Sequence, residues 1–253
     1  MPLPHSSKAG KASAAAIASL AVALAWMSPS ASQTSGVGSE EEYIAAGIFE
    51  TGLIAEMPEG ANCPAIVSGF GDRKNRSGTL RGEYSRWSAH AGVDFGLPEG
   101  TPIVAIADGQ VTTRDIDKPG SDTGNNVIIT HSAITDGNNN GVSSGYAHLS
   151  RFNVNAGERV KRGQVIGFVG KTGTRVTYPH LHLNIFGRQK SQIGGKSFRY
   201  RYDFLQVLSG DMTPIDPVKK RNQKVRLAYM DRFGKVHPPE AKVIWPFVCE
   251  GKL

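Results

Sequence analysis

Short apolar runs, rather than long periodic stretches, dominate the hydrophobic pattern of this 253-residue chain. Many of these runs are rich in Val, Ile and Thr, and the chain has 30 glycines and 14 prolines to form turns between them. This pattern is typical of a strand-dominated fold. Val127–Thr130 and Gly145–Leu149 are two such runs, and the segment Asp136–Gly141 between them predicts a hairpin loop. The length suits one sizeable domain with appendages.

Alternation of polar and apolar residues is clear around His180-Leu181-His182. In a strand, every second side chain lies on the same face. We therefore expect His180 and His182 to point to one face, while Leu181, Leu183 and Ile185 point into a core.

A second segment places another histidine and a carboxylate at compatible spacing. His90 and Asp94 are four residues apart, so an extended backbone puts them on one face. Val93 and Phe95 then lie on the opposite, apolar face. This segment predicts a pair of polar side chains above a buried strand.

The third segment is Tyr146-Ala147-His148-Leu149. The same alternation places Tyr146 and His148 on one face and Ala147 and Leu149 on the other. Three extended segments can thus bring four histidines and one aspartate to a single point.

These residue types favour a catalytic metal centre. Imidazole and carboxylate groups are preferred zinc ligands, and a catalytic zinc normally has three protein ligands and one open position. Two further histidines would serve proton transfer. A structural zinc usually has four ligands rich in cysteine, and no cysteine lies near these segments. For a lone histidine such as His131, at the end of a strand-like run, a structural role is the better interpretation.

Several motifs resemble those of the lysostaphin/LytM-type zinc metalloendopeptidases, which hydrolyse bacterial peptidoglycan. The resemblance covers residues 64–187, in matching order and spacing. It is carried by Ser68–Arg73, His90–Phe95, Thr101–Ala105, Ala107–Gly109, Tyr146–Leu149, Val160–Gly167 and Pro179–Leu183. The order of these motifs makes a chance match improbable.

The resemblance implies a site, a fold and an activity. One Zn²⁺ ion would bind His90, Asp94 and His182, while His148 and His180 would act in catalysis. The fold would be mainly β, an antiparallel sheet of barrel-sandwich (duplicated hybrid motif) type with short terminal extensions. The expected catalytic domain spans residues 63–217, followed by a C-terminal extension at 218–253. The substrate would be the peptide cross-links of peptidoglycan.

The N-terminus has the pattern of a secretory signal peptide, which we expect over residues 1–32. Lys8 and Lys11 precede the apolar stretch Ala14–Trp26, and small residues follow through Ser32. The stretch is shorter than the roughly 20 residues of a membrane span, although an uncleaved anchor remains the alternative. We expect export to the periplasm or the extracellular cell wall, with no stable membrane span after cleavage. His5 lies in the removed segment.

Two features beside the catalytic domain carry further predictions. Residues 33–62 form a polar connector, in which Glu40–Phe49 is a candidate helix capped by Ser39, with Glu42 completing a capping box. Cys63 and Cys249 flank the expected domain. An oxidising compartment favours a disulfide between them, and two buried free thiols are the alternative.

The net charge of +7 indicates a basic protein. Loss of Lys8 and Lys11, which no acidic residue accompanies before position 33, leaves a mature charge of +5. Such a surface attracts anionic polymers. Export argues against nucleic acid, and any single basic cluster can equally be a solvated face. The sequence identifies no protein partner.

Three classes of function remain open at this stage. An active zinc endopeptidase agrees with the intact set of five side chains. A regulator without turnover would need a blocked cleft, for which residues 33–60 or the C-terminal tail are candidates. A cell-wall-binding module is supported only by the basic surface.

Overall fold

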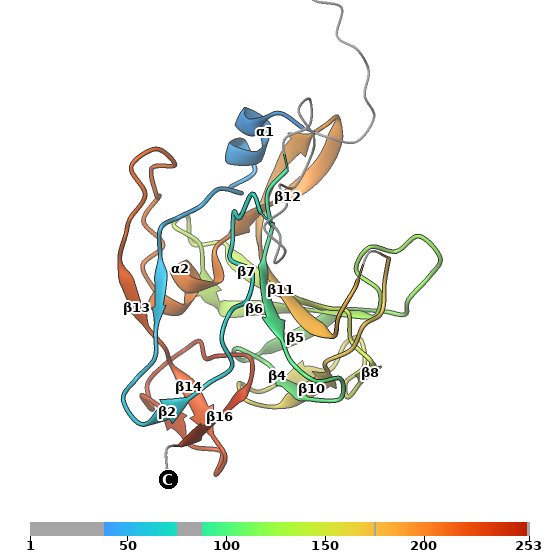
Figure 1. Ribbon diagram of the computed structural model, residues 1–253, viewed down its shortest axis with the longest axis vertical. Coiled ribbons are helices and arrows are strands. Elements are labelled where there is room, and N and C mark those ends of the chain that lie inside the picture. The colour runs from blue at the N-terminus through green and yellow to red at the C-terminus, as the bar shows by residue number, and fades with distance from the viewer. Residues whose placement is uncertain (1–37, 75–87, 175, 252–253) are drawn as a thin grey trace, which may run out of the picture. The chain divides into compact units, whose positions relative to one another are not determined.

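The computed structural model describes residues 38–74, 88–174 and 176–251 (Figure 1). The expected signal peptide, residues 1–32, and residues 75–87 lie outside the described residues. Strands dominate the described residues, as the sequence predicts. In this part of the chain, no helix has the length and apolar character needed to cross a membrane.

The elements follow one another in the chain with mostly short connections. The helices are α1 (Glu40–Ala45) and α2 (Phe204–Ser209). The strands up to the hairpin loop are β1 (Ile54–Glu56), β2 (Ala61–Asn62), β3 (Val93–Gly96), β4 (Pro102–Val104), β5 (Gly109–Asp115) and β6 (Asn126–Thr135). Those that follow are β7 (Gly141–Ala147), β8 (Arg151–Phe152), β9 (Arg159–Val160), β10 (Val165–Phe168), β11 (His180–Ile193), β12 (Lys196–Tyr202), β13 (Lys224–Arg226), β14 (Tyr229–Asp231), β15 (Val236–His237) and β16 (Val248–Gly251).

A seven-stranded antiparallel sheet forms the centre of the described fold, in the order β12-β11-β7-β6-β5-β9, with β3 added beside the first half of β11 (Figure 1). A smaller sheet, β4-β10-β8, contributes to the same buried core. The predicted hairpin joins β6 to β7. Its loop is organised by Asp136, whose carboxylate accepts hydrogen bonds from the backbone amides of Asn138 and Asn140.

The long strand β11 has the predicted alternation. Leu181, Leu183 and Ile185 are fully buried in the core. His180 and His182 lie on the other face of the strand, where β3 and β7 flank them. The period of two therefore separates the polar positions from the core as expected.

The predicted alternation around His148 is wrong. Tyr146 points into the core, where its hydroxyl accepts a hydrogen bond from the Ile106 amide, and it pairs directly with the core residue Leu183. Strand β7 ends at Ala147, and His148 has a left-handed backbone with a φ of 65°. His148 reaches the same face as His182 because the chain turns there, since a continued strand would have kept it beside Tyr146.

Helix α1 begins as predicted and ends early. Ser39 is the N-cap and forms a capping box with Glu42. The helix ends at Ala45, four residues before the predicted Phe49. Gly47 then adopts a φ of 79°, where an added Cβ would lie 2.3 Å from the carbonyl oxygen of Arg201. The tight approach of β12 requires glycine and excludes a continued helix.

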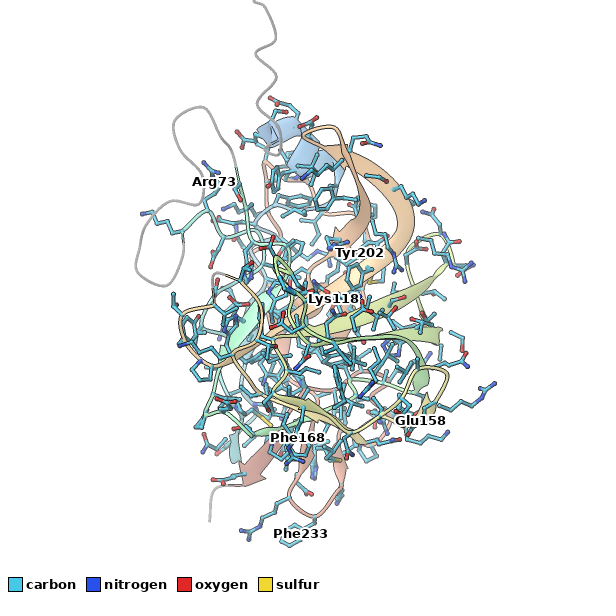
Figure 2. All side chains as sticks on the ribbon, turned by 90° about the vertical axis from the view of Figure 1, so that its right-hand side faces the viewer. Arg73, Lys118, Glu158, Phe168, Tyr202 and Phe233 are labelled. Carbon is cyan, nitrogen blue, oxygen red and sulfur yellow. A yellow bond between two sulfur atoms is a disulfide. The ribbon has the colours of Figure 1, made fainter. Side chains whose placement is uncertain are left out.

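The segments before and after the central sheet pair with each other, and we call the strands β1, β2, β13, β14, β15 and β16 the terminal layer. Within it, β1 pairs with β13 and β2 pairs with β16. The predicted disulfide between Cys63 and Cys249 is present, with a Cα–Cα distance of 4.4 Å. At the turn between β14 and β15, the side chain of Phe233 is exposed at the tip (Figure 2).

Candidate metal centre

The pairing of β3 with β11 creates the first half of the site. His182 lies opposite Asp94 in the register, and its Nδ1 lies 2.8 Å from Asp94 Oδ1. Gly92 makes this approach possible because an added Cβ would lie 2.8 Å from His182 Cε1 and 2.5 Å from the carbonyl oxygen of Leu183. The close contact between these two strands therefore depends on a residue without a side chain.

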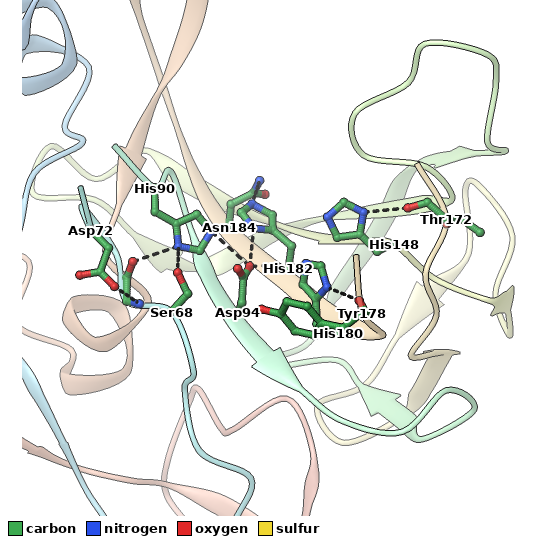
Figure 3. Close-up of polar contacts among 11 residues, drawn as sticks. Ser68, Asp72, His90, Asp94, His148, Thr172, Tyr178, His180, His182 and Asn184 are labelled. Carbon is green, nitrogen blue, oxygen red and sulfur yellow. Dashed lines mark hydrogen bonds and ion pairs between the residues drawn. The ribbon is translucent and has the colours of Figure 1, made fainter. Parts of the chain in front are cut away.

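His90 completes a cluster of three donor atoms. Its Nε2 lies 3.1 Å from Asp94 Oδ1 and 3.1 Å from His182 Nδ1 (Figure 3). The other ring nitrogen, Nδ1, is 2.9 Å from the carbonyl oxygen of Gly69 and 3.1 Å from Ser68 Oγ. A hydrogen bond from Nδ1–H to that carbonyl leaves the Nε2 lone pair directed at the cluster. The three predicted ligands thus converge, with their ligand atoms all within 4.8 Å of one another.

The electrostatics of the cluster suit a cation. Burial by itself favours the neutral acid at Asp94, but the adjacent rings of His182 and His90 hold the pKa of this carboxyl well below its ordinary value. Burial lowers the pKa of His182. Asp94 is consequently ionised and His182 neutral at neutral pH, which are the forms that bind a metal.

Asn184 gives an independent test of whether a metal fits this cluster. Its Nδ2 lies 3.2 Å from His182 Nε2, while its buried Oδ1 has no hydrogen-bond partner among the described residues. If His182 binds a metal through Nδ1, its Nε2 must carry a hydrogen. Rotation of the amide then lets the orphaned oxygen accept that hydrogen, the kind of contact that orients metal-bound histidines. The residues present therefore fit one zinc ion held by His90, Asp94 and His182.

The two predicted catalytic histidines lie beside the cluster and contact each other. The ring centroids of His148 and His180 are 4.6 Å apart, and His180 Nε2 lies 3.9 Å from Asp94 Oδ1. Each ring is oriented through Nδ1, which is 2.9 Å from the carbonyl oxygen of Thr172 for His148 and 2.9 Å from that of Tyr178 for His180 (Figure 3). With the hydrogen on Nδ1, each Nε2 is free to accept or release a proton.

Burial, reinforced by the neighbouring rings of His182 and His180, lowers the pKa of His148 to about 4. His148 is therefore neutral at neutral pH. Since its Nδ1–H faces the Thr172 carbonyl, the Nε2 atom of this neutral ring can accept a proton and pass it to a leaving group.

The remaining histidines of the described residues lie outside the site. His131 is fully buried, with Nδ1 2.8 Å from the carbonyl oxygen of Asp108 and Nε2 2.8 Å from Ser144 Oγ. Its predicted structural role is confirmed. His237, on β15, forms a 2.8 Å contact with Asp231 Oδ2.

Residue types alone did not reveal the groups that orient the site. Gly69, Thr172 and Tyr178 act through backbone carbonyls, which every residue possesses, so no sequence signal marks them. Asn184 was detectable because it is two residues beyond His182 on the same strand face.

Comparison with known proteins identifies the segment that carries these side chains. Residues 88–193 match the model of Peptidase family M23, and all five site residues fall within the match. Residues 88–193 form a peptidase family M23 domain. The predicted resemblance to zinc metallopeptidases of the lysostaphin type is thereby confirmed.

Characterised relatives of the M23 domain carry related names. The chain is 48% identical over 96 residues to DD-carboxypeptidase/endopeptidase Mpg of Neisseria meningitidis, covering 38% of this chain and 20% of that protein. It is 47% identical over 94 residues to peptidoglycan DD-endopeptidase ShyC of Vibrio cholerae, covering 37% of this chain and 19% of that protein. The match to glycyl-glycine endopeptidase ALE-1 of Staphylococcus capitis is 44% over 95 residues, covering 37% and 24%.

The matched region thus spans about a quarter or less of the length of these relatives. Among solved structures, the catalytic domain of lysostaphin from Staphylococcus simulans is 32% identical, with 44% of this chain and 75% of that chain covered and a TM-score of 0.34.

Proposed function

We propose that this protein is an exported zinc metallopeptidase that hydrolyses peptide cross-links of bacterial peptidoglycan. The convergence of His90, Asp94 and His182 beside His148 and His180 is the observation that carries the proposal. The names of the relatives, which are peptidoglycan and glycyl-glycine endopeptidases, support the substrate class. A regulator that had lost turnover would be expected to lack one of these five side chains, and all five are present.

When bound by His90, Asp94 and His182, zinc supplies a Lewis acid for the scissile carbonyl and lowers the pKa of a coordinated water to about 7. Asp94 contributes negative charge from a buried position and is shared by both histidine ligands. The backbone carbonyl of Gly69 orients the His90 ring, and the side-chain amide of Asn184 orients the His182 ring. Each does so through a hydrogen bond to the ring nitrogen that faces away from the metal position.

We assign the proton transfers to the two histidines outside the ligand set. His180 is the general base, and its Nε2 takes a proton from the attacking water. The proton that His180 takes from the water then passes to the leaving amine, and we assign its delivery to His148, whose Nε2 can accept it because the Nδ1 hydrogen faces the Thr172 carbonyl. The short distance between the two rings, 4.6 Å between centroids, allows both to contact one tetrahedral carbon and its substituents.

We further propose the assignment of the rest of the chain. Residues 1–32 are a signal peptide, 33–62 a connector, 63–217 the catalytic domain and 218–253 a C-terminal extension. The disulfide between Cys63 and Cys249 supports export to the periplasm or the extracellular wall, because disulfides persist in oxidising compartments. The basic charge supports accumulation on an anionic polymer rather than on nucleic acid, which an exported protein does not meet.

Digestion of purified peptidoglycan sacculi tests the proposal. The chain from residue 33 to 253 is loaded with zinc and incubated with sacculi, with and without a chelator, and released fragments are identified by mass spectrometry. We expect chelator-sensitive loss of cross-linked fragments, and the new termini identify the bond that is cut. A zinc-loaded protein that releases nothing from sacculi of several wall types would contradict the proposed activity.

A further inference from the structure

A groove of about 510 Å³ is lined by β1 and by residues of the segment that leads to the metal centre, and we call it the β1 groove. Its size is in the range of natural binding pockets. Most of its lining is apolar and includes Phe70, Leu205 and Trp245. Two further lining residues, Ile54 and Met57, are 55% and 39% exposed. Large apolar side chains exposed beside an apolar groove are typical of an interaction surface.

One edge of β1 faces no partner strand. Within the described part of the chain, β1 pairs with a single strand, β13, which lies beside it in Figure 1. The backbone hydrogen bonds to β13 are made by Ile54 and Glu56, so the N–H and C=O of Ala55 between them point away from β13. Ala55 is exposed and lines the β1 groove. A free, accessible strand edge is a template for the addition of another strand.

The polar part of the lining is acidic. Glu50, Asp72 and Asp203 line the β1 groove, and no lysine, arginine or histidine among the described residues does so. Glu50 pairs with Lys220, whereas neither Asp72 nor Asp203 forms a salt bridge in the described part of the chain. Asp203 is only 4% exposed, and its carboxylate is held by neutral donors such as the hydroxyl of Thr51. A buried carboxylate without a counter-charge is unfavourable, so a cation is its natural complement.

The β1 groove is adjacent to the metal centre but separate from it. None of the five histidine and aspartate side chains of the site lines the groove. The two are joined by a turn, in which Asp72 accepts a 2.7 Å hydrogen bond from the amide of Gly69, and both residues line the groove. On its other side, the carbonyl oxygen of Gly69 lies 2.9 Å from His90 Nδ1. A molecule in the groove therefore leaves the metal-ligand atoms uncovered.

We propose that the β1 groove binds an extended segment of a partner protein, rich in apolar and basic residues, that adds to β1 as a strand. Main-chain hydrogen bonds to Ala55 supply affinity, apolar side chains enter the groove, and a lysine or arginine faces Asp72 and Asp203. A small amine would use the lining but not the strand edge, so the free edge favours a peptide. The inference goes beyond the proposed function and does not depend on it.

Selection from a peptide library tests the proposal. Short random peptides displayed on mRNA are selected on the immobilised, zinc-loaded protein, and the enriched sequences are synthesised and titrated by calorimetry. We expect the enriched peptides to alternate apolar residues with lysine or arginine, as strand addition beside acidic groups requires. Enrichment of acidic peptides, or the lack of any common pattern, would overturn the proposal. The readout is binding, so the result stands whether or not the protein cleaves peptidoglycan.

Two variants and a matched control assign this binding to the β1 groove. Ala55→Pro removes the N–H at the free edge and leaves the hydrogen bonds to β13, so selected peptides should bind about five- to tenfold more weakly. Ala55→Val keeps the N–H and should bind like wild type. Asp203→Asn keeps the N-cap of α2 and should weaken binding of the basic peptides about fivefold. Circular dichroism verifies the fold of each variant.

The remaining outcomes identify other occupants. Equal affinities for Ala55→Pro and Ala55→Val would exclude strand addition and overturn the proposal. Weaker binding in Asp203→Asn alone would indicate a site for small cations and would overturn it as well. Sedimentation of the wild type measures self-association, and a dimer that Ala55→Pro abolishes would show that a second copy of the chain covers the edge, which would also contradict the partner peptide.

Discussion

The candidate metal centre and the terminal layer are held together in different ways, the first by a long paired strand and the second by short strands and a disulfide. The centre lies on β11, a strand of 14 residues that pairs with β3, β7 and β12. The terminal layer consists of strands of two to four residues, tied by the disulfide between Cys63 and Cys249. We therefore expect substitutions of the site side chains to leave the fold intact, whereas changes in the terminal layer should mainly lower stability.

The two regions meet at Phe95, next to the proposed ligand Asp94. Its ring contacts Trp245 at 5.1 Å and Phe247 at 5.4 Å between centroids, both from the segment that leads into β16. The segment that leads into the terminal layer thus supports β3 from the core side, while the proposed ligands face the other way. Substitutions that change zinc binding or catalysis but not stability, or stability but not catalysis, test this difference between the two regions.

The largest effect is expected for the carboxylate ligand. Asp94→Ala removes the carboxylate that lies 3.1 Å or less from both His90 and His182, which we propose as one of three zinc ligands. Bound zinc should fall to background after dialysis, and cleavage of sacculi should be lost with it. Metal content by mass spectrometry and circular dichroism are measured together. A folded variant that keeps stoichiometric zinc would exclude Asp94 from the ligand set.

Next in size is the loss of His148, which we propose as a catalytic histidine. His148→Ala should retain zinc and fold while kcat falls by about 10²–10⁴, the usual contribution of a positioned acid or base. The ring contacts the ligands but does not hold the metal cluster together. Activity within threefold of wild type, at equal zinc content, would remove His148 from the mechanism.

In the terminal layer, the double change Cys63→Ser and Cys249→Ser should lower the free energy of unfolding by about 2–5 kcal/mol. Zinc content and kcat at 25 °C should stay close to wild type, because neither sulfur touches the site. Urea unfolding measures the free energy of unfolding of this variant, and steady-state kinetics measures its kcat. A large loss of kcat in protein that is still folded would show that the terminal layer positions β3 and would break the proposed separation.

A smaller effect is expected for Asn184, whose side-chain amide contacts His182. Asn184→Ala removes the amide that faces His182 Nε2 and should weaken zinc binding about 10–100-fold, the typical effect of such orienting contacts. Competition with a zinc-binding dye measures the affinity without any activity assay. Gln110→Ala, at an exposed position of β5, is a control of similar size. Unchanged affinity in Asn184→Ala would show that His182 needs no partner at Nε2.

The smallest effect is expected on the pH dependence of stability and involves Asp203, the buried N-cap of α2. Burial raises the pKa of Asp203 from 3.8 to about 6, against hydrogen bonds from Thr51 and Leu205. A raised carboxyl pKa gives stability that is present below pH 3.8 and is lost as pH rises through about 6. Asp203→Asn keeps the cap. Between pH 4 and 7.5, wild type should lose about 2 kcal/mol more stability than Asp203→Asn. Parallel stability curves for both proteins would show that Asp203 does not titrate in this range.

Period-two patterning predicted the parts of the site that lie within strands. His180 and His182 alternate with buried leucines, and the ligand types follow from the preference of zinc for imidazole and carboxylate groups. The capping box at Ser39 was equally readable, because it depends on residues three apart. The disulfide was predictable because the chain has only two cysteines.

Only the tertiary structure decided the rest. Tyr146 faces the core and His148 leaves the strand, since a left-handed residue cancels the alternation that the sequence pattern implied. The carbonyl oxygens of Gly69, Thr172 and Tyr178 select which ring nitrogen is free. The sequence by itself determined which side chains are available for chemistry, because residue type and period are local. The orientation of these side chains came from the fold. Every residue type has the same backbone carbonyl and can pair in a strand, so only the three-dimensional arrangement decides which of these groups contact the site.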